Sequence, residues 1–168
     1  GRDERGALDA WGTICALAAI TERIRLGTVV SPATFRHPSE LAKLVVTADH
    51  VSGGRFELGL GSGWHEAEHR LFGFPFPDVC ERFDVLEEQL EIVTRSWADE
   101  PFAFDGRHYR LERTDPRPKP LARPRPLLRL GGAGKRRAAA LAARYADEYN
   151  AVLVGPEAVA QVRRALDD

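Results

Sequence analysis

Glycines follow two short apolar runs, and their spacing points most directly to ligand binding. The run Arg55–Trp64 stops in alternating glycines at Gly59, Gly61 and Gly63. A short apolar run bounded by glycines is typical of a buried strand. Glycine leaves room where another backbone or a ligand comes close. The glycine end of this strand is therefore where we first expect chemistry.

A second glycine-rich turn, Gly131-Gly-Ala-Gly134, lies between a predicted strand, Leu127–Leu130, and a predicted helix that begins at Lys135. Backbone N–H groups at a helix start, together with the positive end of the helix dipole, bind anions. The basic residues at 135–137 add positive charge. From these residues alone, a phosphate site and a tight turn without a ligand both remain open.

The stretch His65-Glu-Ala-Glu-His69 matches the H-E-x-x-H pattern. In zinc proteases this spacing places two imidazoles on one helical face, and here Glu66 would be the general base. The stretch follows a glycine loop and runs into Phe-Gly-Phe-Pro, which leaves little more than one helical turn. The residues that could supply a third zinc ligand are Glu81, Glu87 and Glu88. A zinc hydrolase is thus an alternative to a solvated turn.

Two charges lie inside predicted strands, where both faces should be buried. Glu57 and Arg129 each precede the first glycine of their strand end by two residues. A buried charge needs a partner. We therefore predict a structural Glu57–Arg129 ion pair between neighbouring strands.

Strands and helices alternate along the chain. Apolar periodicity predicts helices over Leu8–Ala19, Pro38–Val51, Cys80–Trp97 and Lys135–Tyr145, and another from Pro156 with Val159, Val162 and Leu166 facing inward. The predicted strands are Ile24–Val30, the Arg55 run, Leu127–Leu130 and Tyr149–Val154. Asp105-Gly106 predicts a hairpin within Phe102–Leu111, Leu71–Pro77 reads as an irregular loop, and the prolines at 116–126 predict an extended connection. The pattern indicates an α/β fold with about half of an eight-stranded parallel barrel.

Composition narrows the function classes. The 168 residues are 43% hydrophobic and 29% charged with a net charge of −1, which gives no electrostatic reason to expect nucleic acid or an anionic membrane as partner. No apolar run approaches the roughly 20 residues that span a bilayer. Cys15 and Cys80 lie in apolar helical patterns, so we expect reduced core thiols and a cytoplasmic protein. The absence of methionine leads us to expect part of a longer protein.

An ordered set of short motifs makes the chain similar to a known family. The motifs are Thr21-Glu-Arg-Ile-Arg-Leu-Gly-Thr28, Phe35-Arg-His-Pro38, Leu41-Ala-Lys43, Ser52-Gly-Gly-Arg55, Leu58-Gly-Leu-Gly-Ser-Gly-Trp64, Glu81-Arg-Phe83, Gly106-Arg-His-Tyr109, Leu130-Gly-Gly132 and Ala143-Arg-Tyr-Ala-Asp147. Together they resemble the luciferase-like flavin and deazaflavin oxidoreductases, and most of all the subgroup of coenzyme F420-dependent oxidoreductases.

The resemblance implies a (β/α)8 TIM barrel that binds FMN or F420 at the carboxyl ends of its strands. On that basis residues 1–168 form a single, incomplete barrel domain holding the fourth to seventh strands, with the first three and the last absent. It also implies which residues contact the cofactor: Ser31, Gly61, Ser62, Gly63, Trp64, Gly131 and Gly132. Arg129 departs from the family, which usually has an aliphatic residue there.

The expected function is hydride transfer to or from F420 on a small organic substrate. An FMNH2-dependent monooxygenase is the alternative within the family. A zinc hydrolase and a non-catalytic binding module are the alternatives of other classes. We identify no catalytic proton donor, so the chain alone is expected to be inactive. Its two open sheet edges are expected to cause self-association or a homo-oligomer.

Overall fold

The computed structural model describes residues 6–132, 136–151, 155, 157, 159–160 and 163–164. Several sequence predictions lie outside these residues. They concern the turn and helix start at Ala133–Lys135, the strand end at Val152–Val154, and Pro156, Val162 and Leu166 of the last helix. Val159 is described, and the prediction that it faces inward is wrong, because this residue is 48% exposed.

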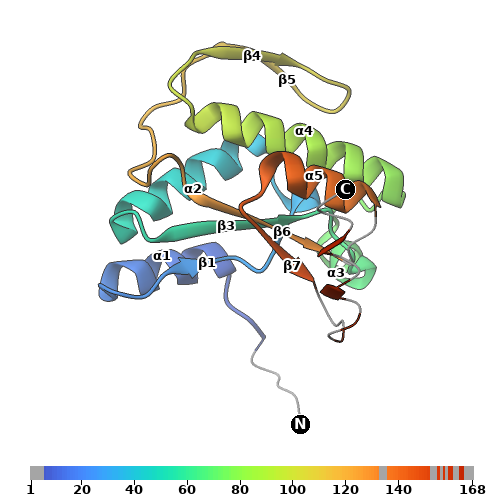
Figure 1. The fold of residues 1–168 in the computed structure, drawn as a ribbon, viewed down its shortest axis with the longest axis horizontal. Coiled ribbons are helices and arrows are strands. Elements are labelled where there is room, and N and C mark those ends of the chain that lie inside the picture. The colour runs from blue at the N-terminus through green and yellow to red at the C-terminus, as the bar shows by residue number, and fades with distance from the viewer. Residues whose placement is uncertain are drawn as a thin grey trace.

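One parallel sheet organises the chain (Figure 1). Its strands are β1 (Leu26–Gly27), β2 (Ser31–Pro32), β3 (Phe56–Gly61), β6 (Leu127–Gly132) and β7 (Glu148–Ala151). They lie in the order β1-β3-β6-β7, and β2 also pairs with β3. The prediction of parallel strands alternating with helices is confirmed.

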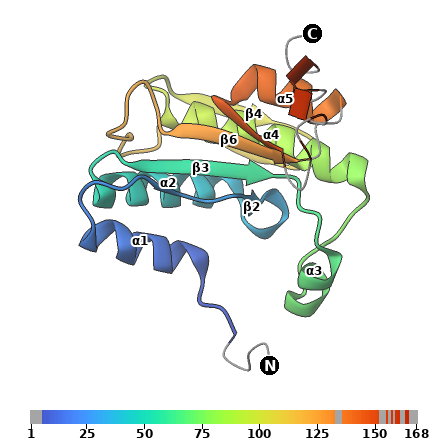
Figure 2. The ribbon, with the colours of Figure 1, turned by 60° about the horizontal axis from the view of Figure 1, so that its bottom comes forward.

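Four helices form a row along the sheet. They are α1 (Ala10–Ile20), α2 (Pro38–Ser52), α4 (Val79–Trp97) and α5 (Arg136–Tyr145). Each packs against the next in the row, and Figure 2 shows the row following the curve of the sheet. A 3-10 turn, η1 (Ala33–Phe35), and a short helix, α3 (Glu66–Phe72), follow the carboxyl ends of β2 and β3. The predicted hairpin is the antiparallel pair β4 (Phe102–Asp105) and β5 (Arg110–Thr114).

The core lies between the sheet and the helices. On β3, Phe56, Leu58 and Leu60 belong to the buried cluster that includes helix residues such as Leu41 and Leu90. Successive side chains of a strand point to opposite faces, so Glu57, Gly59 and Gly61 point to the other face, the interior of the barrel. On its interior face, β3 therefore carries a charged side chain near its start and no side chains toward its carboxyl end.

The strand predicted over Ile24–Val30 is wrong as a continuous element. Gly27 pairs with Glu57 and Ser31 with Leu60, so four steps along this strand match three along β3. The extra residue is a bulge, which separates β1 from β2. Within it, the Thr28 hydroxyl donates to the Gly59 carbonyl at 2.7 Å and accepts from the Gly59 N–H at 3.0 Å. A side chain thus replaces the missing backbone pairing.

Two smaller predictions also need correction. Leu71 and Phe72, expected in an irregular loop, form the last turn of α3. Cys80 is exposed and is not a core thiol, because it lies in the first turn of α4, whereas the buried residues of this helix begin at Leu86. Cys15 is half-buried. Over the ranges that the structure describes, no helix has both the length and the apolar character to cross a membrane.

Arg55 connects the Ser52-Gly-Gly-Arg55 motif to Thr21. Its guanidinium donates to the carbonyl oxygens of Ser52, Ile24, Ala18 and Thr21, at distances between 2.5 and 3.0 Å. The carbonyl groups of a helix end have no partner inside the helix. Arg55 therefore caps α1 and fixes it to the start of β3.

Candidate functional site at the carboxyl edge of the sheet

The structure brings most of the predicted cofactor residues to one edge of the sheet. Ser31 lies opposite Leu60 of β3, and Leu60 lies opposite Leu130 of β6. Gly61 and Gly131 are the next residues along these strands, so they lie side by side at the carboxyl edge. Carboxyl ends of parallel strands are where ligands bind in such folds.

Val30 occupies the space that two of these glycines leave, and it is not among the residues predicted for the site. A Cβ at Gly61 would lie 2.8 Å from Val30 Cγ2, and a Cβ at Gly131 would lie 2.9 Å from Val30 Cγ1. The close approach predicted at these glycines is thus made by this chain's own bulge. Val30 therefore provides an apolar floor to the edge.

The remaining predicted residues form the rim. Gly63 has a φ of +79°, a left-handed conformation that favours glycine. Trp64 is 79% exposed, and its ring contacts that of His65 with 5.0 Å between centroids. A Cβ at Gly132 would lie 2.9 Å from the Tyr149 hydroxyl. Ser62 is half-buried between Gly61 and Gly63. The structure brings Trp64 to the rim without burying it.

The H-E-x-x-H pattern does not build a zinc site. His69 is 1% exposed, and both ring nitrogens are engaged, Nδ1 with the His65 carbonyl at 2.9 Å and Nε2 with the Thr34 hydroxyl at 2.6 Å. His65 is exposed. Among the residues that the structure describes, no three His, Cys, Asp or Glu side chains are grouped as metal ligands.

Two of the glutamates considered as third ligands have other partners, and one of them, Glu87, forms ion pairs with Arg137 and Arg144. The Glu88 carboxylate accepts backbone N–H groups of Arg107, His108 and Tyr109 at distances from 2.7 to 3.3 Å. It thereby fixes the turn of the β4–β5 hairpin against α4, and a Cβ at Gly106 would collide with it at 2.5 Å. This contact explains the Gly106-Arg-His-Tyr109 motif structurally.

The predicted Glu57–Arg129 ion pair is confirmed and extends across the sheet. Arg129 Nη2 lies 2.9 Å from Glu57 Oε2, and these side chains are 17% and 11% exposed. Glu57 also pairs with Arg25, and Arg129 pairs with Glu148. We call these four residues the charge ladder. Hydrogen bonds to Glu148 and Glu57 raise the pKa of the Arg129 guanidinium above its ordinary value, so Arg129 stays charged at physiological pH.

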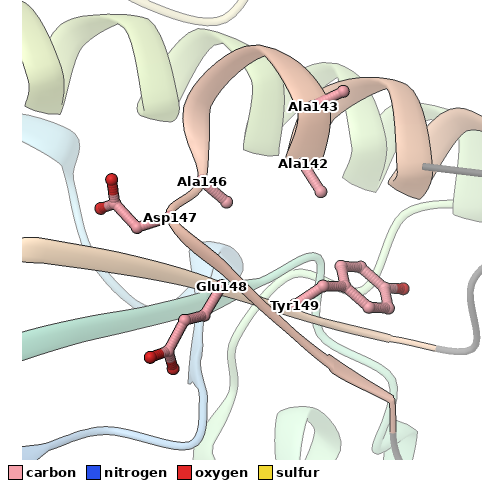
Figure 3. Close-up of a pocket in the computed structure, with 6 residues that line it drawn as sticks. All are labelled: Ala142, Ala143, Ala146, Asp147, Glu148 and Tyr149. Carbon is pink, nitrogen blue, oxygen red and sulfur yellow. The ribbon is translucent and has the colours of Figure 1, made fainter. Parts of the chain in front are cut away.

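A hollow of about 180 Å³ lies elsewhere, between α5 and the start of β7. Figure 3 shows Ala142 of α5 and Ala146, the residue that follows this helix, facing β7, with Tyr149 beside them and Glu148 on the other side of the strand. The carboxyl ends of the strands do not line it. This hollow is therefore not the predicted cofactor site.

The sequence profile of the luciferase-like monooxygenase family matches residues 2–168. The chain belongs to this family. Its structure is accordingly a partial luciferase-like (β/α)8 barrel. The relatives of this chain include proteins named as FMNH2-dependent and as putative F420-dependent enzymes.

Individual relatives cover most of this luciferase-like chain. An FMNH2-dependent dimethylsulfone monooxygenase of Pseudomonas putida is 34% identical over 134 residues, 80% of this chain and 36% of that protein. A putative coenzyme F420-dependent oxidoreductase of Mycobacterium tuberculosis is 31% identical over an alignment of 185 positions, which covers all of this chain and 52% of that protein. The crystal structure of a monooxygenase of Streptomyces bottropensis has a TM-score of 0.80 at 27% identity, over 95% of this chain and 49% of that one. The chain thus spans about half, or less, of the length of these relatives.

Proposed function

We propose that the protein transfers a hydride to or from coenzyme F420 on a small organic substrate. The observation that carries the proposal is the meeting of Ser31, Gly61 and Gly131 at one strand edge, with the Gly63 loop at its rim. The F420-dependent relative that matches the whole chain supports it. A second candidate is an FMNH2-dependent monooxygenase, favoured by the relative of that name from Pseudomonas putida.

The residues present suit a flavin-type cofactor. Glycine backbone and the hydroxyls of Ser31 and Ser62 can donate to phosphate or ribityl oxygens, and Val30 offers an apolar surface to a flat ring. None of the seven proposed cofactor residues carries a negative charge that would repel a phosphate. When bound, the cofactor would supply the hydride acceptor or donor. In our proposal Ser31, Gly61, Ser62, Gly63, Trp64, Gly131 and Gly132 hold it, and the substrate lies on its open side.

Titration of the purified protein with F420 and, separately, with FMN tests the function. We expect saturable binding of F420, followed by the change in its absorbance or fluorescence, and weaker binding of FMN. Binding of FMN alone would replace the first candidate with the second. Binding of neither would overturn both.

The same titration on a Gly132 variant tests the site. We expect Gly132→Asp to weaken cofactor binding about 100-fold or more, because a carboxylate at the rim would repel the phosphate. Gly132→Ala is the matched control, since its methyl group meets only the end of the Tyr149 side chain at 2.9 Å. We expect it to cost less than about fivefold. Equal effects of the two variants would remove Gly132 from the site.

We also propose that the 168-residue chain associates with itself or with a partner that supplies further strands. The described sheet ends at β1 and β2 on one side and at β7 on the other. Unpaired strand edges invite pairing with another chain. Light scattering after size-exclusion chromatography should give a mass above 18.6 kDa. A monomer with well-protected edge amides in hydrogen exchange would contradict this proposal.

A further inference from the structure

The loop after β3 is held from two sides by residues that neither the family match nor the proposed function assigns. Gly63 lies against the Thr34–His69 pair, because a Cβ built on Gly63 would be 2.9 Å from Thr34 Oγ1 and 3.3 Å from His69 Cε1 and Nε2. There is therefore no space between this loop and the two side chains. A shift of either one would move the loop.

His69 links the loops that follow two different strands. A carbonyl oxygen only accepts, so His69 Nδ1 must donate to the His65 carbonyl, and in the neutral ring Nε2 accepts the hydroxyl proton of Thr34. Phe35 and Phe76 pack edge-on around the imidazole, each with 4.7 Å between ring centroids. The ring thereby ties α3, after β3, to η1, after β2.

Arg82 holds the same loop from α4. Its Nε donates to the Gly63 carbonyl oxygen at 3.1 Å, and its Nη1 donates to the Pro77 carbonyl. The guanidinium also stacks over the Phe76 ring at 4.0 Å from the centroid. Phe76 thus contacts both His69 and Arg82, so the two supports form one packed unit.

We propose that Thr34, His69 and Arg82, which we call the Gly63 clamp, are positioning residues that hold the Gly61–Trp64 loop in its cofactor-binding conformation. This inference rests on the proposed function. The second histidine of H-E-x-x-H acts in it as a buried support, not as a metal ligand. Because a preformed loop loses less conformational entropy when it binds, the clamp raises affinity without touching the cofactor.

Arg82→Met is the first test, with Arg70→Met as its matched control. Arg70 is exposed on α3, so the control makes the same change on the neighbouring helix without touching the loop. We expect Arg82→Met to weaken cofactor binding about tenfold, the effect of one charge-assisted hydrogen bond. In the absence of cofactor, amide hydrogen exchange in the peptide covering residues 60–66 should accelerate about tenfold.

Thr34→Val and His69→Phe test the other side of the clamp. Thr34→Val keeps the shape and removes only the hydroxyl, so it remains informative if His69→Phe does not fold. We expect both to accelerate exchange in residues 60–66 and to weaken binding, whereas His65→Gln changes neither. Equal effects of His65 and His69 variants would favour a metal site and overturn the clamp.

The two readouts separate failure of the clamp from failure of the proposed function. Hydrogen exchange needs no cofactor, so unchanged exchange in Arg82→Met would overturn the clamp whatever the protein binds. Faster exchange with unchanged affinity would overturn its role in binding. If the wild-type protein binds neither F420 nor FMN, the proposed function falls, and the role of the clamp in cofactor binding falls with it.

Discussion

Gly59→Ala is expected to lower the free energy of unfolding by about 4 kcal/mol or more, which is most of the stability of a protein at the low end of the ordinary range. A Cβ at this position would lie 2.0 Å from the Thr28 carbonyl oxygen and 2.9 Å from its carbonyl carbon. Both are backbone atoms of the bulge, so no rotamer change relieves the overlap. Chemical denaturation followed by circular dichroism measures the loss.

Gly12→Ala is the matched control for that substitution. Gly12 lies in the first turn of α1, and a Cβ there would meet only Asp9 Oδ2 at an ordinary 3.5 Å. Alanine is favoured over glycine in a helix, so we expect a gain of about 0.5–1 kcal/mol. If Gly59→Ala lowered the free energy of unfolding only by an amount comparable to the change at Gly12, the bulge would be able to shift away from β3 and accommodate the methyl group.

Arg129→Met is expected to lower the free energy of unfolding by about 2–3 kcal/mol, because it leaves a largely buried carboxylate without its main partner. Glu57 is 11% exposed at its side chain and would keep only Arg25, whose side chain is 64% exposed. Equilibrium denaturation in urea at neutral pH gives the value.

The double variant Glu57→Gln/Arg129→Met separates the ion pair from the packing of the two side chains. We expect it to be less destabilised than the sum of the single variants, because removing both charges leaves no unpaired ion. Additive effects would show that the two charges do not interact in solution. The same set of single and double variants should be measured at high salt. We expect the interaction energy of the two charges to change little there, because salt screens a pair this buried only weakly.

The local elements of the fold were predictable because their signals are local. The predicted helix Pro38–Val51 matched α2 to within one residue, and Gly53, with a φ of +64°, is the residue that ends it. Asp105-Gly106 predicted the β4–β5 hairpin, and the apolar spacing from Cys80 to Trp97 matched α4 to within one residue. The Glu57–Arg129 pair was predictable because both charges hold the same place relative to the glycines of neighbouring strands.

The bulge and the clamp were not predictable from the sequence. Thr28, Val29 and Val30 have the β-branched side chains of an ordinary strand, and what interrupts them is the Thr28 hydroxyl bonding to Gly59 of another strand. That partner is distant in sequence and leaves no periodic signal. The pattern around His69 suggested metal chemistry, because a motif records residue types and spacing but not which hydroxyl or carbonyl each nitrogen meets in the fold.

The charge ladder gives the two edges of the sheet opposite charges. Its order from one edge to the other is cation, anion, cation, anion, and its exposed ends are Arg25 and Glu148, with side chains 64% and 49% exposed. Two β7 edges brought together would set one carboxylate against another, and two β1 edges would set one guanidinium against another. Only a β1 edge and a β7 edge carry opposite charges where the ladder ends. The ladder therefore disfavours the pairing of two identical edge strands, which can start aggregation.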